Sequence, residues 1–252
     1  MNKNFVRPAE YFKVEAKESF CRILSDIELI DMRRSIYSFS ENISILPPTV
    51  TNEVYLIFDD NESKRKRLVD FSLAKTFSYV LYDWIVDKDL KSGYEDAQTI
   101  AKFMDELGSQ RLGSCSVQAL NHFQKNANNF IEAMWEEKKL QPTLENYKKL
   151  LEKKSKIYTA MYGAAATVGN ATEDELGKVK NFSESFYKSS QLIDDLKDHD
   201  KNEKWNLVNF LGREKVEQMK REFQQKAIES IRLTRKCKHT NYLIALVDFI
   251  YQ

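Results

Sequence analysis

Apolar residues recur at helical spacing along most of this chain. Between residues 8 and 32, for example, apolar side chains stand three or four positions apart, as on one face of an α-helix. The same spacing predicts helices over residues 8–32, 64–88, 94–107, 116–139, 144–168, 172–199, 214–235 and 241–251. Pro47 and Pro48 interrupt the pattern, because proline disfavours helix at its own position and at the preceding one. No useful stretch has the two-residue period of a strand, so we expect one all-α domain over residues 1–252 that binds ligands between facing helices.

The composition narrows the choice of function. Seven glycines and four prolines in 252 residues are few, which favours long helices. A net charge of +1 argues against a dedicated nucleic-acid binder, which would carry a basic excess. No window approaches the roughly 18 apolar residues of a membrane span, and residues 242–251 are expected to form a terminal core helix. The widely spaced Cys21, Cys115 and Cys237 are expected to be reduced thiols, as is typical of the cytoplasm.

An acidic motif, D-D-x-x-D, stands at the end of the helix predicted over residues 172–199. Asp194 and Asp198 are four positions apart and therefore share one helix face, where they repel each other unless a cation joins them. Apolar residues interrupt the acids, so the motif is more than a solvated charge run. Paired carboxylates of this kind suit a hard divalent cation, and such cations often accompany a phosphate.

A second acidic pair, Asp83 and Asp87, ends the aromatic helix predicted over residues 64–88. Carboxylates at a helix C-terminus oppose the helix dipole, and a bound divalent ion would remove that cost. Taken alone, the pair is equally well interpreted as exposed helix-end acids. Taken with Asp194 and Asp198, it predicts carboxylates around one cavity mouth that hold several Mg²⁺ ions on a diphosphate. Aromatic side chains behind the acids would stabilise cationic carbon.

Residues 191–198 (QLIDDLKD) resemble the second aspartate-rich motif of the class I isoprenoid synthases, and residues 81–87 (LYDWIVD) resemble the first, with Trp84 in place of its second aspartate. The resemblance implies an all-α bundle with a central apolar cavity, Mg²⁺ as cofactor and a prenyl diphosphate as substrate. It implies catalytic roles for Asp83, Asp87, Asp194, Asp195 and Asp198. The implied metal ligands are Asp83, Asp87, Asp194, Asp198 and, as in the family's cyclases, Asn202. The diphosphate would be bound by Lys154, Lys197, Lys201 and Arg111, and the cavity would be lined by Phe77, Tyr79, Tyr158, Met161 and Gln191.

The chain also departs from the family pattern. Chain-elongating members carry a pair of arginines shortly after the first motif, whereas residues 88–94 contain none. We therefore expect ionisation of a single prenyl diphosphate followed by cyclisation or water capture, as in a class I terpene synthase, with prenyl transfer to an acceptor as the alternative. Asp59 and Asp60 are a rival first motif. A catalytically silent subunit of a heteromeric synthase, or an interaction protein with merely superficial acids, also remains open, and a homodimer is compatible with such a bundle.

Overall fold

The computed structural model describes residues 17–25, 36, 44, 46–87, 94–201 and 203–250, and its elements in this part of the chain are helices. Residues 17–25 are helical. The further helices are α3 (Leu46–Phe58), α4 (Glu62–Asp87), α5 (Tyr94–Gly113), α6 (Val117–Glu137), α7 (Leu144–Lys154), α8 (Lys156–Val168), α9 (Glu173–Asp198), the short 3₁₀ helix η1 (His199–Lys201), α10 (Leu207–Leu211), α11 (Arg213–Arg232) and α12 (Lys238–Ile250). The prediction of an all-α fold is confirmed. Among the described helices, none combines the length and the apolar character that crossing a membrane requires.

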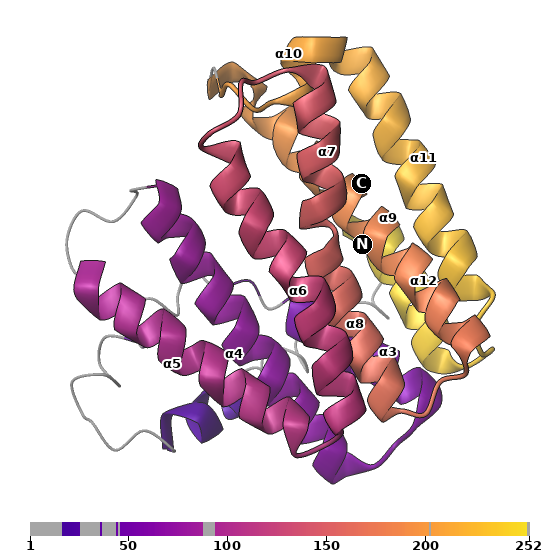
Figure 1. Ribbon diagram of the computed structural model, residues 1–252. Coiled ribbons are helices and arrows are strands. Elements are labelled where there is room, and N and C mark those ends of the chain that lie inside the picture. The colour runs from indigo at the N-terminus through magenta and orange to yellow at the C-terminus, as the bar shows by residue number, and fades with distance from the viewer. Residues whose placement is uncertain are drawn as a thin grey trace.

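Helix α8 forms the centre of the bundle and packs against α3, α6 and α9 (Figure 1). Its segment 163–166 consists of one glycine and three alanines, all buried. A Cβ atom at Gly163 would lie 2.3 Å from Nε2 of His122, so the glycine makes room for a side chain of α6. Small residues on α8 thus allow its neighbours to approach closely. Helices α5 and α11 cover this inner layer, packing on α4 and α9 respectively.

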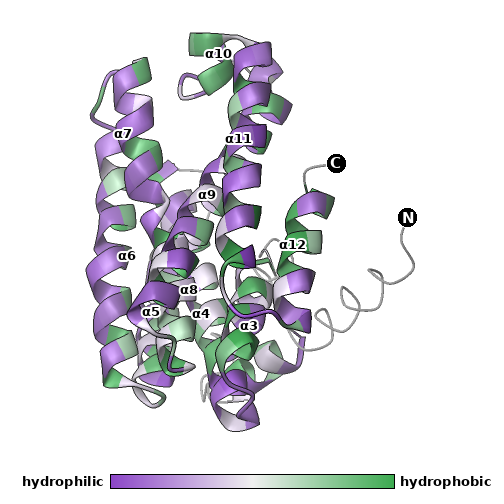
Figure 2. Ribbon diagram, turned by 90° about the vertical axis from the view of Figure 1, so that its right-hand side faces the viewer, coloured by the Kyte–Doolittle hydropathy of each residue, from purple (hydrophilic) through white to green (hydrophobic). Residues whose placement is uncertain are grey.

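The apolar side chains form three core clusters. The first and largest lies around α8 and draws side chains from α3, α4, α6, α9, α11 and α12. The second lies between α4 and α5, and residues 17–25 pack against it. The third joins α7, α9, α10 and α11 near the end of α9. Polar residues dominate the outward faces of the helices (Figure 2). The three clusters therefore fix the ends of α4 and α9, which carry the acidic motifs.

The start of α3 and the break between α7 and α8 both differ from the sequence prediction. Pro47 and Pro48 open helix α3, which we did not predict, because proline is tolerated in a first turn, where the missing N–H has no helical partner to lose. The helix predicted over residues 144–168 is interrupted at Ser155, between α7 and α8. The Ser155 hydroxyl donates to the Glu152 carbonyl oxygen at 2.7 Å, and such bonds compete with the helical ladder. The bond from Thr159 N to the Ser155 carbonyl oxygen is long, at 3.5 Å.

Candidate active site

The two acidic motifs occupy the C-terminal ends of α4 and α9. Helices α4, α6 and α9 all end towards the upper side of the view in Figure 1, where α7 begins. Asp83 and Asp87 lie in the last turns of α4, and Asp194 and Asp198 lie in the last turns of α9. The arrangement of the helices therefore places these four carboxylates at one end of the bundle.

Two side chains between these helix ends interact electrostatically with both motifs. Lys154 of α7 lowers the pKa of Asp83 by its charge and also lowers that of Asp195. Burial raises the pKa of the Tyr187 hydroxyl well above its ordinary value, and the charges of Asp83 and Asp194 raise it further. Charges act at this strength only over short distances. The acids of α4 and α9 thus flank a common site, which we call the acidic mouth: Asp83, Asp87, Glu137, Asp194 and Asp198, with the cations Lys138 and Lys154.

The acidic mouth disfavours negative charge. The Asp83 side chain reaches solvent, but the protein atoms around it displace much of its water, which raises its pKa. The charges of Asp87 and Glu137 add to this effect, and the pKa of Asp83 reaches about 6. Loss of water also raises the pKa of Asp194, with Asp198 contributing. A divalent cation would relieve this repulsion.

Asp195 occupies a different environment from its neighbours in the motif. It is 4% exposed, and its Oδ2 accepts hydrogen bonds from the Tyr147 hydroxyl at 2.6 Å and from Leu207 N at 2.9 Å. Asn206 donates to the Asp195 carbonyl oxygen at 2.8 Å and caps α10. Gln191, which we expected in the cavity, hydrogen-bonds to the Asp195 carboxylate. These contacts join α7, α9 and α10, so the geometry favours a structural role for Asp195, and its catalytic role stays a prediction.

Trp84 and Phe77 both lie on the side of α4 that faces α5. Phe77 is fully buried in the second core cluster, where its ring lies 6.4 Å from that of Phe20. It is therefore not where we expected it, because it is turned about 120° around α4 from Asp83, at 100° per residue. Trp84 packs against the same cluster. A residue at position 84 thus points towards α5, and the tryptophan leaves Asp83 and Asp87 in place at the mouth.

Other predicted cavity residues lie in the first core cluster, behind the acidic mouth. Tyr79 is buried against Phe130, with ring centroids 5.4 Å apart. Met161 is buried, and its sulfur accepts a hydrogen bond from the Ser72 hydroxyl at 3.8 Å. The ring of Tyr158 lies against those of Tyr162, Phe186 and Tyr187, with centroids 5.1 to 5.8 Å away. Phe182 extends this cluster through contacts with Tyr162 and Phe186. The space behind the mouth is therefore aromatic and apolar, whereas a central cavity stays a prediction.

Two predicted ligands lie at the far end of the bundle. Arg111 lies in the last turn of α5 and lines a pocket with Arg67, close to the start of α4. Asp59 accepts hydrogen bonds from Asp60 N and Asn61 N in the turn before α4. At a rise of 1.5 Å per residue along α4, Arg67 lies about 24 Å from Asp83, and the start of α4 beside Asp59 lies about 30 Å from it. The structure therefore places neither Arg111 nor the rival motif of Asp59 and Asp60 at the acidic mouth.

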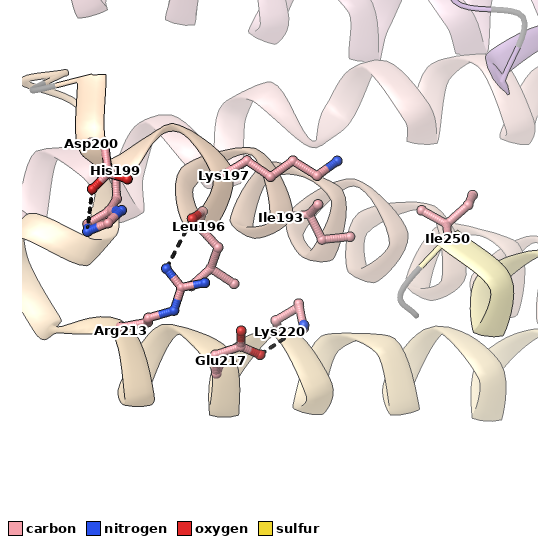
Figure 3. Close-up of a pocket in the computed structure, with 9 residues that line it drawn as sticks. All are labelled: Ile193, Leu196, Lys197, His199, Asp200, Arg213, Glu217, Lys220 and Ile250. Atoms are coloured by element: carbon pink, nitrogen blue, oxygen red, sulfur yellow. Dashed lines mark hydrogen bonds and ion pairs between the residues drawn. The ribbon is translucent and has the colours of Figure 1, made fainter.

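The structure gives less support for a place of Lys197, Lys201 and Asn202 in the acidic mouth. Lys197 lines a cavity of about 440 Å³ between α9 and α11, together with Ile193, Arg213 and Lys220 (Figure 3). It lies on the α11 side of α9, although its charge lowers the pKa of Asp194. The backbone of Lys201 belongs to η1, and Asn202 lies outside the described residues.

Sequence reasoning missed two members of the acidic mouth, Glu137 and Lys138. Glu137 forms a short ion pair with Lys154, and Lys138 forms one with Asp87. Glutamates at the end of a helix are usually a solvated charge pair, so the sequence alone does not single them out. One sequence signal could have revealed these pairs. Acids end one predicted helix, and Lys153 and Lys154 lie on the next helix, which packs antiparallel to it. Glu136 pairs with Lys153 at 2.6 Å in the same way.

The residues of the acidic mouth fit magnesium in their chemistry. Carboxylate oxygens are the ligands that Mg²⁺ prefers, and Mg²⁺ is commonly held by one or two carboxylates plus substrate phosphates rather than by a protein cage. The described residues contain no group of three or more acids, histidines or cysteines arranged as a metal cage. Asp83 with Asp87, and Asp194 with Asp198, would therefore hold the metal weakly on their own and firmly together with a diphosphate.

Solved structures with the same architecture include proteins named as prenyl transferases and prenyl diphosphate synthases. A geranyltransferase from Legionella pneumophila aligns with a TM-score of 0.82 over 99% of this chain and 98% of its own, at 13% identity. A putative farnesyl-diphosphate synthase from Marinomonas sp. MED121 gives 0.81 over 100% of both chains at 14% identity. A geranylgeranyl pyrophosphate synthetase from Geoglobus acetivorans gives 0.79 over 97% and 98% at 15% identity. This chain has the all-α isoprenoid synthase fold. No protein-family model and no curated protein sequence matches it.

Proposed function

We propose that the protein is a Mg²⁺-dependent prenyltransferase, which ionises an allylic prenyl diphosphate and transfers the prenyl group to an acceptor. The observation that carries the proposal is that Lys154, which pairs with Glu137 of α6, lies within electrostatic reach of acids on both α4 and α9, and so does Tyr187. An interaction protein with merely superficial acids would not need its two motifs at one site. Bound Mg²⁺ would neutralise the leaving diphosphate and assist cleavage of the C–O bond.

The side chains of the mouth have separable tasks in this proposal. Asp83 and Asp87 on one side, and Asp194 and Asp198 on the other, would hold the metal ions. Lys154 would bind diphosphate oxygens directly, as an ammonium donor between the two acidic pairs. The aromatic rings behind the mouth, such as Tyr158, would exclude water from the allylic cation and attract it through their faces.

Two observations favour a catalytic transferase over the other interpretations. The solved neighbours are named as prenyl transferases and prenyl diphosphate synthases, which supports transfer over single-substrate cyclisation. The silent-subunit hypothesis rested on Trp84, but this side chain packs towards α5. Its presence therefore does not argue against metal binding by Asp83 and Asp87.

The test supplies C5, C10, C15 and C20 allylic diphosphates with Mg²⁺, with and without isopentenyl diphosphate, and measures pyrophosphate release and products. Prenyl transfer predicts release that depends on the acceptor and on Mg²⁺. Asp194→Asn should abolish it. Asp174→Asn is the matched control, because Asp174 is 77% exposed at the opposite end of the same helix.

Three outcomes would contradict the proposal. Release without an acceptor, with a hydrocarbon or alcohol product, would show the single-substrate reaction instead. Equal loss in Asp174→Asn would show that the substitution acts through folding. No release from any allylic diphosphate, with or without isopentenyl diphosphate, would exclude the reaction for these substrates and this acceptor.

A further inference from the structure

The end of α6 places two adjacent, oppositely charged side chains in the acidic mouth. Glu137 is the last residue of α6, and its Oε2 pairs with Nζ of Lys154. Lys138 caps the helix, and its Nζ pairs with Oδ1 of Asp87. One dipeptide thus engages both a proposed metal ligand and the proposed diphosphate ligand.

The charges of the mouth are interdependent. Glu137 raises the pKa of Asp83, whereas Lys154 and Lys138 lower it. Within the mouth as described, five carboxylates share two ammonium groups. Removal of either Lys138 or Lys154 would therefore increase the repulsion among the carboxylates. Lys138 is also well placed as a cation at a helix C-terminus, where the helix dipole favours it.

The two ion pairs differ in exposure. The side chains of Lys154 and Glu137 are 19% and 23% exposed, whereas those of Lys138 and Asp87 are 44% and 38% exposed. Water screens an exposed pair more strongly than a sheltered one. The Lys154–Glu137 pair should therefore be the stronger barrier to a competing ligand.

We propose that Glu137 and Lys138 are internal counter-ions that occupy Lys154 and Asp87 until ligand binds, and then give way to diphosphate and metal respectively. The inference rests on the proposed function, because it takes Asp87 as a metal ligand and Lys154 as a diphosphate ligand. The exchange keeps the sign of the charge at each position. A divalent cation replaces an ammonium group beside Asp87, and phosphate oxygens replace a carboxylate beside Lys154.

The metal side of the exchange is tested with Lys138→Gln, which keeps the length of the side chain and removes its charge. Binding of Mn²⁺ alone is followed by electron paramagnetic resonance, since Mn²⁺ takes the same oxygen ligands as Mg²⁺. We expect Mn²⁺ to bind about two- to fivefold more tightly, the range for loss of a partly exposed ion pair. Lys139→Gln is the matched control, because Lys139 is exposed and has no ion pair among the described residues.

The diphosphate side is tested with Glu137→Gln and inorganic pyrophosphate in the presence of a chelator, by calorimetry. Freeing Lys154 should tighten pyrophosphate binding by about fivefold or more, because this pair is the more sheltered one. Glu136→Gln removes the same charge one residue earlier, from the pair with Lys153, and should give a smaller gain. Adding Lys154→Gln to Glu137→Gln should cancel the gain.

Tighter binding in both variants, with smaller changes in both controls, supports the exchange, and a structural defect would not produce it. Wild-type affinity in both variants overturns the inference and leaves the proposed function intact. A gain in one variant alone overturns the claim for the other ion pair. A wild-type protein that binds neither Mn²⁺ nor pyrophosphate overturns the proposed function and the inference together. Circular dichroism melting of each variant confirms that the comparison is between folded proteins.

Discussion

Removing the Tyr147 hydroxyl should destabilise the end of the bundle that carries the acidic mouth. The hydroxyl donates to Oδ2 of Asp195 at 2.6 Å, and both residues are buried, at 6% and 4% exposure. A hydrogen bond to a buried charged group contributes about 1.5–3 kcal/mol. A loss of about 2 kcal/mol in a domain of this size lowers Tm by about 4–8 °C. Tyr147→Phe should show this shift in thermal unfolding followed by circular dichroism.

Tyr79→Phe is the matched control for this experiment. Tyr79 is also 6% exposed, but within the described part of the chain its hydroxyl makes no hydrogen bond. Its substitution should change Tm by less than about 2 °C. Tyr147→Phe should also leave binding of pyrophosphate with Mg²⁺ nearly unchanged, since Tyr147 supports Asp195 rather than the metal. Equal Tm values for the two variants would refute the view that this hydrogen bond holds α7 to α9.

The placement of single side chains leads to three further predictions. Arg111→Ala should leave the affinity for pyrophosphate with Mg²⁺ within about twofold of wild type in calorimetry, because Arg111 lies at the far end of α4; a larger loss would contradict that placement. Glu175→Gln should cost about 1–2 kcal/mol at pH 7 in denaturant unfolding, because hydrogen bonds from Arg235 hold the pKa of Glu175 at about 2. This stabilisation is complete above the ordinary pKa of 4.5 and should vanish as the pH falls towards 2, whereas a constant difference would contradict it. Mn²⁺ affinity should fall by about tenfold per pH unit below pH 6, as Asp83 takes up a proton; a flat profile down to pH 5 would exclude Asp83 as a ligand.

Helical periodicity was sufficient to predict the fold class and most helix positions. Thr172 and Glu175, for example, form the capping box that opens α9, at the predicted start of that helix. Helix α3 was missed because a proline pair is compatible with the end of one helix and with the start of another, and only packing decides between the two. The interruption at Ser155 was missed because serine is compatible with both helix and a competing hydroxyl bond.

For the candidate site, the sequence predicted only which residues of a single helix share a face. The i, i+4 spacing of Asp83 with Asp87 sets a shared helix face, but the pairing of Asp87 with Lys138 requires the position of α6. Likewise, D-D-x-x-D suggests three equivalent acids, whereas burial against Tyr147 separates Asp195 from the others. Contacts between distant helices depend on how the core packs, and a single sequence does not reveal them.

The most direct test of the central claim is a double-mutant cycle between Asp83 and Asp194. Pyrophosphate binding in the presence of Mg²⁺ is measured by calorimetry for wild type, Asp83→Asn, Asp194→Asn and the double variant. Asparagine keeps one oxygen ligand, so binding should weaken but remain measurable. If both acids hold one metal–diphosphate group, the cycle should give a coupling energy of at least about 1 kcal/mol, which is about fivefold in affinity. Additive effects within about 0.3–0.5 kcal/mol would show that α4 and α9 do not share a ligand.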